Sequence, residues 1–169
     1  MKKLLSLFVI IVFCSPAFAT RIKIVQSSNF QYSTCRKPEE LYGPLPICKG
    51  SSAQDVAYSI YDDVYVMAIS DDGQFVVGTG GVFFDGKEAK ESDIALAFYK
   101  KGELIKKYSA LEIAGSKNNV RLDRALIKGT YEIFEDIDGG SIKGNVFEVK
   151  TVDGRILKFD IHTGELVKR

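Results

Sequence analysis

Hydrophobic and polar residues alternate with a period of two along most of the chain after residue 56. The C-terminal part shows this most clearly, because Leu157, Phe159 and Ile161 fall on one face of an extended segment and Lys158 falls on the other. Such alternation indicates antiparallel strands that lay one face on a hydrophobic core. We predict strands over residues 56–61, 64–69, 74–84, 93–100, 103–108, 120–127, 130–134, 145–152, 157–161 and 165–167.

Short polar turns that contain glycine separate these segments. The turns are Asp71-Asp72-Gly73, Asp85-Gly86, Lys101-Gly102, Asp153-Gly154 and Thr163-Gly164. Glycine accepts a positive φ in such turns without a Cβ clash. One segment breaks the pattern, since Ser109 can cap a helix and Gly115 can end it. The predicted fold class is therefore all-β, with antiparallel meanders forming blade-like sheets in an open propeller-like or sandwich arrangement, and one short helical turn near residues 110–114.

The first nineteen residues have the three-part layout of a secretory signal peptide. Two lysines precede an apolar stretch over residues 4–13, and Ala17 and Ala19 place small residues at the −3 and −1 positions of a cleavage site. As a helix the apolar stretch would span only about 15 Å, half of a bilayer core, so a membrane anchor is disfavoured. The bulky Phe13 before Cys14 disfavours a lipoprotein signal.

We therefore expect cleavage after Ala19 and a mature protein that is periplasmic or secreted, with no stable membrane insertion. Its 150 residues suffice for one domain with its own core. We divide the chain into the signal peptide (1–19), an N-terminal segment of polar and irregular pattern with a disulfide-clamped loop (20–55), and a β-repeat domain (56–169). The last two are expected to pack as one unit. The net charge of the whole chain is only +1, so nucleic acid is not expected as a partner.

Two cysteines, Cys35 and Cys48, remain in the mature chain. In an oxidising compartment an even pair favours a disulfide, and the spacing does not fit a Cys-x-x-Cys redox motif. The segment between them holds three prolines, and a stiff loop with an aromatic anchor loses little entropy on docking. The predicted partner-binding residues in this loop are Leu41, Tyr42, Leu45 and Ile47. The alternative is that these four side chains fold back and plug one end of the sheet.

Candidate sites for chemistry are weak in this sequence. Asp136 and Asp138 are the best metal candidates, because alternate acids before glycine can wrap Ca²⁺. However, Ile137 stands where an EF-hand has a ligand, and an acid-rich hairpin turn explains the segment equally well. No cofactor is expected. The segment Gly78–Gly81 suggests a phosphate loop, but strand-forming residues follow it, so we favour a bulge or bend. We interpret His162 as an exposed turn residue.

Residues 145–167 resemble one repeat of the quinoprotein-type β-propellers, which reads strand, Asp-Gly turn, strand ending in Asp, Thr-Gly turn and a last strand. The matching residues are Asp153, Gly154, Phe159, Asp160, Thr163 and Gly164. Residues 64–169 are similar, more loosely, to uncharacterised exported bacterial proteins with propeller-like β-repeats, a resemblance that implies no activity. The chain has no Trp to dock neighbouring blades and room for only about three blades. We therefore expect two or three blade-like sheets packed openly, or an assembly completed by another copy.

The leading functional hypothesis is a non-enzymatic binding or scaffold module of the cell envelope, which uses the 35–48 loop to hold an envelope or extracellular protein. The first alternative is a secreted inhibitor that presents this loop to a hydrolase. The second is a hydrolase with a carboxylate site formed from Asp62, Asp63, Asp71 or Asp72, which requires these acids to converge in one pocket. No other catalytic residue is predicted, and an enzyme is the less favoured class.

Overall fold

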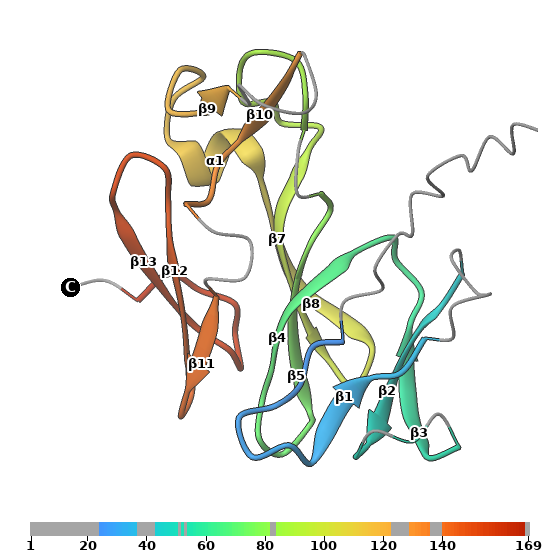
Figure 1. The fold of residues 1–169 in the computed structure, drawn as a ribbon. Helices are drawn as coiled ribbons and strands as arrows, with labels where there is room; N and C mark the ends of the chain where they lie inside the picture. Colours follow the sequence, from blue (N-terminus) through green and yellow to red (C-terminus); the bar gives the residue numbers. More distant parts are fainter. Residues whose placement is uncertain are drawn as a thin grey trace, which may run out of the picture.

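The computed structural model describes residues 24–36, 43–50, 52, 54–81, 84–122, 129–135 and 140–167. Figure 1 shows an all-β architecture of small antiparallel sheets with one short helix, which confirms the predicted fold class. The described strands form no closed barrel. No helix in the described ranges is long and apolar enough to cross a membrane. The predicted signal peptide lies outside these ranges, and its cleavage stays a prediction.

The described strands form four antiparallel sheets. The N-terminal sheet contains β1 (Tyr32–Thr34), β2 (Leu45–Lys49) and β3 (Val56–Ile60). The central sheet contains, in spatial order, β4 (Tyr65–Ile69), β5 (Phe75–Thr79), β7 (Ile94–Lys100) and β8 (Glu103–Ser109). A small sheet contains β6 (Phe84–Asp85), β10 (Thr130–Glu132) and β9 (Arg121–Leu122). The C-terminal sheet contains β11 (Ser141–Lys143), β12 (Val146–Lys150) and β13 (Ile156–Asp160).

The structure differs from the predicted strands in four places. β1 and β2 lie in the segment 20–55, whose polar pattern carried no strand signal. Pairing of Leu45 with Ile60 attaches β2 to β3, and β1 lies on the other side of β2. The predicted strand over 74–84 is divided, because β5 ends at Thr79 and β6 belongs to a different sheet. This division arises because β6 pairs with β10, which is distant in the chain. β11 is a further strand that the pattern did not predict, and residues 165–167 form only an isolated bridge, between Leu166 and Phe159.

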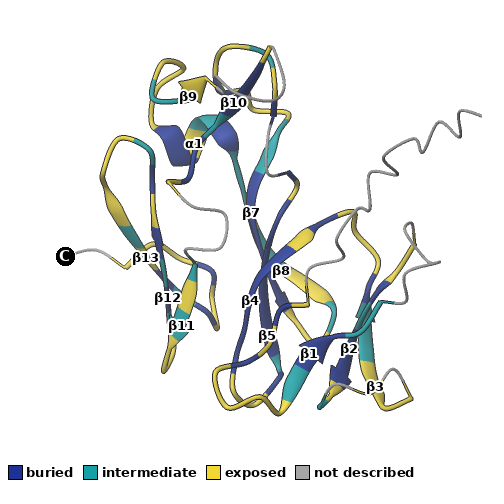
Figure 2. Cartoon of the chain, viewed as in Figure 1, coloured by how far each residue is buried: buried dark blue, intermediate teal, exposed yellow. Residues whose placement is uncertain are grey.

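Three strands of the central sheet, β4, β5 and β7, are buried along most of their length, as Figure 2 shows, whereas β8 is half-buried to exposed. All five residues of β5 are buried. Val77 belongs to the core shared with the C-terminal sheet, and Val76 belongs to the core shared with the N-terminal sheet. On β7, Phe98 and Tyr99 are divided between the two cores in the same way. The N-terminal, central and C-terminal sheets therefore form three layers.

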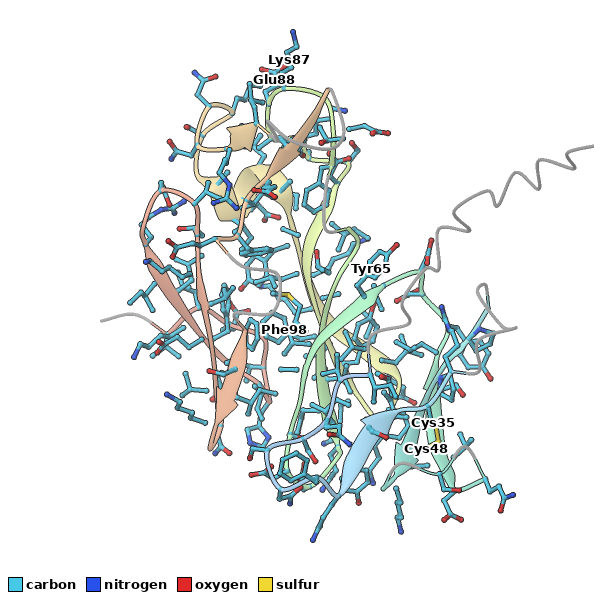
Figure 3. All side chains as sticks on the ribbon, viewed as in Figure 1. Cys35, Cys48, Tyr65, Lys87, Glu88 and Phe98 are labelled. Atoms are coloured by element: carbon cyan, nitrogen blue, oxygen red, sulfur yellow. A yellow bond between two sulfur atoms is a disulfide. The ribbon has the colours of Figure 1, made fainter. Side chains whose placement is uncertain are left out.

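The larger core lies between the central and C-terminal sheets and is built around Phe98 (Figure 3). The ring centroid of Phe98 lies 5.3 Å from that of Phe159, 6.0 Å from that of Phe147 and 6.3 Å from that of Tyr108. Aromatic pairs at such separations each contribute about 0.5–1.5 kcal/mol beyond the area that they bury. This cluster joins β7 and β8 to β12 and β13.

The two outer sheets each carry a contact that lies outside the two hydrophobic cores. On the C-terminal sheet, Glu148 lies opposite Lys158, and their side chains form an ion pair of 2.9 Å. On the N-terminal sheet, a disulfide joins the fully buried Cys48 to Cys35, as predicted, beside an irregularity in the pairing of β2 with β3. One outer sheet therefore carries an ion pair, and the other carries the covalent clamp.

Helix α1 (Ala110–Ala114) is the predicted helical turn. The Ser109 hydroxyl accepts from the Glu112 amide, and the Glu112 carboxylate accepts from the Ser109 amide, which forms a capping box. Gly115 ends the helix at φ +73°. The short helix lays Ile113 on the larger core.

Two glycine turns bring each sheet close to the next. Gly102, between β7 and β8, has φ +87°, and a Cβ there would lie 2.4 Å from the carbonyl oxygen of Ser59 on β3. Gly164, after β13, has φ +70°, and a Cβ there would lie 2.6 Å from the Cβ of Lys106 on β8. At each of these two positions the backbone has a positive φ and leaves no room for a Cβ, and glycine satisfies both conditions.

Replacing Gly102 by Ala is expected to destabilise the protein more than replacing Gly154 by Ala. Gly154 has φ +85°, close to the +87° of Gly102, but a Cβ on Gly154 meets open space. The Gly154 variant therefore reports backbone strain alone, about 1–2 kcal/mol. The Gly102 variant adds an overpacking cost of about 1–3 kcal/mol against β3. Urea denaturation measures the difference, and equal losses would contradict the close contact between the two sheets.

Candidate functional site

The four acids of the predicted carboxylate site do not come together. Asp62 and Asp63 precede β4, whereas Asp71 and Asp72 follow it, so the strand separates the two pairs by about 25 Å. All four residues are exposed. The Asp62 carboxylate accepts a hydrogen bond of 2.8 Å from the Tyr99 hydroxyl. The two pairs therefore do not form the single pocket that a carboxylate-dependent hydrolase requires.

Asp72 shows how such an acid serves the fold. Its carboxylate accepts hydrogen bonds from the Ser70 hydroxyl at 2.7 Å and from the Gln74 amide at 3.0 Å. Partial burial raises the pKa of Asp72, but these hydrogen bonds outweigh burial and hold the pKa below its ordinary value. The ionised carboxylate thus closes the turn between β4 and β5.

The glycine segment Gly78–Gly81 lies at the end of β5. A Cβ on Gly78 would lie 3.1 Å from the carbonyl oxygen of Tyr65, and a Cβ on Gly80 would lie 3.0 Å from that of Ile94. The next described element is the strand β6, whereas a phosphate loop leads into a helix N-terminus. These glycines therefore allow neighbouring strands to approach closely.

His162 is exposed on its turn, in agreement with the sequence interpretation. Its backbone amide donates a hydrogen bond of 2.7 Å to the Asp160 carboxylate. Its ring also meets the Phe75 ring edge-on, with 4.5 Å between the ring centroids. The turn after β13 therefore packs against the central sheet, a contact that the sequence did not indicate.

The predicted partner-binding residues fall into two groups. Leu45 and Ile47 are buried between the N-terminal and central sheets. They belong to strand β2, so they lie inside the sheet, neither on an exposed loop nor folded back over the end of the sheet. Leu41 and Tyr42 lie outside the described residues, and partner binding through them stays a prediction.

The metal candidates Asp136 and Asp138 also lie outside the described residues. In the part of the chain that the structure describes, no group of three or more His, Cys, Asp or Glu residues gathers to hold a metal ion. Glu135, which precedes the candidates, forms an ion pair of 2.6 Å with Lys150. Glu135 therefore links the segment that follows β10 to the end of β12.

The connection from β3 to β4, residues 61–65, is an exposed aromatic site that the sequence analysis missed. We call it the tyrosine connection. Tyr61 is 81% exposed and Tyr65 is 59% exposed, whereas Val64 between them is buried. Figure 3 shows Tyr65 at the start of β4. Because Val64 and the hydrogen-bonded Asp62 fix the connection at two points, it presents two rings to solvent on a rigid support.

The tyrosine connection adjoins the disulfide-clamped loop. Leu45 and Ile60 lie opposite each other at the end of the antiparallel pair β2 and β3. Pro44, which precedes Leu45, and Tyr61, which follows Ile60, are therefore neighbours. In the sequence, both tyrosines border strand-like runs and were assigned to strands. The exposure of their rings becomes apparent only in the structure, which shows where β3 ends and where β4 begins.

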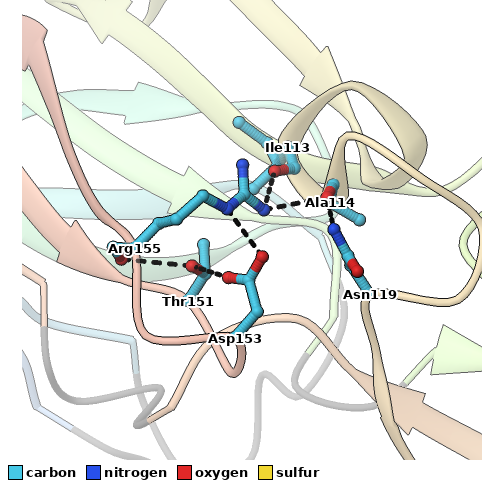
Figure 4. Close-up of polar contacts among 6 residues, drawn as sticks. All are labelled: Ile113, Ala114, Asn119, Thr151, Asp153 and Arg155. Carbon is cyan, nitrogen blue, oxygen red and sulfur yellow. Dashed lines mark hydrogen bonds and ion pairs between the residues drawn. The ribbon is translucent and has the colours of Figure 1, made fainter.

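A polar cluster joins the C-terminal sheet to helix α1 (Figure 4). Arg155 Nη2 donates to the carbonyl oxygens of Ile113 at 3.0 Å and Ala114 at 2.8 Å, and Arg155 Nε donates to the Asp153 carboxylate at 2.7 Å. Asn119 donates to the same Ala114 oxygen at 2.9 Å. The guanidinium therefore satisfies carbonyl groups that the end of a helix leaves unpaired.

A pocket of about 540 Å³ lies beside this cluster, lined by residues 118–122 together with Val152 and Asp153. Its charged groups are engaged within the protein, because Arg121 pairs with Glu132 and Asp153 pairs with Arg155. A ligand pocket needs a few polar groups that are available to orient its ligand. The polar cluster and its pocket are therefore best explained by the packing of α1.

Comparison of the chain with protein-family models, curated proteins and solved structures finds no match. Function must therefore be argued from the exposed site itself. That site is the tyrosine connection.

Replacing Asp153 by Asn is expected to lower stability at neutral pH and to make stability fall less steeply in acid. Partial burial raises the pKa of Asp153, but hydrogen bonds from the Thr151 hydroxyl and the Arg155 guanidinium outweigh it and lower the pKa. A carboxyl with a lowered pKa stabilises the fold above its unfolded pKa of about 3.9, and this stabilisation is lost as the pH falls through the folded value. Urea denaturation at neutral pH and below about pH 4 measures both effects. Equal acid slopes in the two proteins would contradict this role of Asp153.

Proposed function

We propose that this protein is a non-enzymatic binding module that holds another protein outside the cytoplasm. The observation that carries the proposal is the tyrosine connection, which exposes Tyr61 and Tyr65 on a fixed support. Rigid aromatic side chains supply contact area at a low cost in conformational entropy, and they are enriched at protein interfaces. A single exposed apolar residue needs no explanation, but two rings on one pinned connection favour a docking surface.

The proposed location is the periplasm or the external medium, after cleavage behind Ala19. The Cys35–Cys48 disulfide supports this location, because disulfides form and persist in oxidising compartments. The proposed partner is accordingly an envelope or extracellular protein. The clamped loop, with Leu41 and Tyr42, is proposed to extend the docking surface beyond Tyr61.

The relationship to propeller-like repeats is a further part of the proposal. The central sheet is a four-stranded antiparallel meander, and its strands follow one another in chain order apart from the excursion through β6. Its first strand, β4, contacts both β1 and β11. Contact among the first strands of the three sheets supports a propeller-like arrangement in which each sheet is one blade. The ion pair on the C-terminal sheet argues against a second copy of the chain adding a further blade beside that sheet.

A secreted inhibitor of a hydrolase is the second candidate, favoured by the disulfide that closes the proline-containing segment between Cys35 and Cys48. An inhibitor lowers the activity of its target when added to it, whereas a scaffold leaves that activity unchanged. A panel of secreted hydrolases, assayed with the purified protein at micromolar concentration, separates the two. The separation of the acid pairs along β4 argues against the third hypothesis, a carboxylate-dependent hydrolase.

Replacing Tyr61 and Tyr65 together by Ala is expected to weaken partner binding about tenfold or more. The unfolding free energy should stay within about 0.5 kcal/mol of the wild-type value, because both rings are exposed. Crosslinking and pull-down from the native envelope fraction identify the partner, and titration of the purified partner gives the dissociation constant. The matched control is Ile156→Ala, which truncates a side chain that is 44% exposed on the C-terminal sheet.

Wild-type binding by the control and weak binding by the double variant are the expected pair of results. Unchanged binding by the double variant would contradict the proposal. A marked loss of thermal stability without a loss of binding would instead assign the two tyrosines to packing.

A further inference from the structure

Turns that begin in the same way occur three times in the described structure, at residues 27–32, 70–75 and 151–155, the third being one residue shorter at its closing hydrogen bond. In each turn the hydroxyl of the first residue hydrogen-bonds the side chain of the third. These pairs are Ser27 with Asn29, Ser70 with Asp72, and Thr151 with Asp153. In each turn the amide of the fourth residue also donates to the carbonyl oxygen of the first, at 2.9 or 3.0 Å. The shared hydrogen bonds make the three turns directly comparable.

The fourth position of this turn requires a positive φ. Two of the turns place glycine there, Gly73 at +66° and Gly154 at +85°, whereas the first turn places Phe30 there at +60°. A bulky side chain is strained in this left-handed conformation, and glycine is not. The Phe30 ring is 69% exposed, so little burial offsets the strain. Backbone strain of this kind is concentrated at functional sites.

The chain around Phe30 is held firmly by the next turn of the same kind. The Ser28 hydroxyl donates to the Asp71 carboxylate at 2.6 Å, and the Asn29 amide donates to the same oxygen at 3.0 Å. The Asn29 side chain donates to the Asp71 carbonyl oxygen at 3.0 Å. These contacts keep the strained conformation in place and fix the position of the exposed ring.

We infer that Phe30 anchors a second docking surface, which takes a polypeptide segment with an apolar socket for the ring and a cationic side chain for Asp71. A fixed aromatic side chain that is open to solvent is well suited to fill a pocket on a partner. The Asp71 carboxylate is exposed and bonded to the same turn, so it selects a partner of positive charge.

This surface is distinct from the tyrosine connection. Asp71 follows the end of β4, whereas Tyr65 begins that strand, so the two surfaces lie at opposite ends of β4. Figure 2 shows the chain that leads into β1, which contains Phe30, as an exposed turn. The inference does not rest on the proposed function, and each surface has its own variants.

Selection of a random-peptide phage library on the purified exported protein tests the inference. The expected peptides combine large apolar residues with Arg or Lys, and their affinity falls as the salt concentration rises. Phe30→Ala and Phe30→Gly should each weaken the selected peptide about tenfold or more, and Phe30→Trp should retain its binding. The Tyr61 and Tyr65 double variant should bind it as wild type does.

Thermal unfolding separates an interaction role of Phe30 from a packing role. Phe30→Gly should raise Tm by about 2 °C because it relieves the strain, whereas Phe30→Ala keeps the strain and should leave Tm within about 1 °C. A fall of several degrees in Phe30→Ala would show that the ring packs against the fold and would overturn the inference. Selection of no such peptide, or equal binding by the wild type and both variants, would overturn it as well.

Discussion

Burial of the central sheet on both faces along β4, β5 and β7 governs how the rest of this protein is arranged. Phe98 and Tyr99 are neighbours on β7, yet they belong to different cores. Burial of such a side chain contributes about 1.5–3 kcal/mol to stability. Removal of either outer sheet would therefore expose a row of apolar side chains to water and lose this stabilisation. Among the described residues the two hydrophobic cores lie on either side of the central sheet, while the C-terminal sheet also carries the Glu148–Lys158 ion pair and the N-terminal sheet carries the disulfide. These contacts account for an arrangement of three layers.

This arrangement leaves the ends of the strands as the surfaces for recognition. The inner faces are filled, and the acids that suggested catalysis close turns or fix connections, as Asp72 and Asp62 do. The exposed aromatic residues lie at strand ends, with Tyr61 just after β3, Tyr65 at the first position of β4, and Phe30 beside the turn that follows β4. A stiff scaffold with aromatic residues on fixed connections is suited to binding, because little freedom remains to be lost on docking.

The period-two pattern predicted the C-terminal strands, and local capping chemistry predicted the helical turn, because both depend on residues close in sequence. The disulfide was also predictable, from the compartment and the count of cysteines. β1 and β2 were not predicted, since β1 is short and polar and β2 is interrupted by Pro46, and the two become strands by pairing with each other and with β3. For the same reason Leu45 and Ile47 were taken as docking residues, and the exposure of Tyr61 and Tyr65 was missed. The role of Phe30 becomes visible only by comparison with Gly73 and Gly154 in the equivalent turns.

Native-state hydrogen exchange tests the doubly buried central sheet most directly. If the three layers unfold together, the slowest amides of β5, β7 and β12 should exchange with one common free energy, equal to the global value from urea denaturation. The same value should hold for β2 in the N-terminal sheet. Exchange of the β12 amides at a clearly lower free energy, while β5 and β7 stay protected, would show that the C-terminal sheet opens independently and would contradict a shared core.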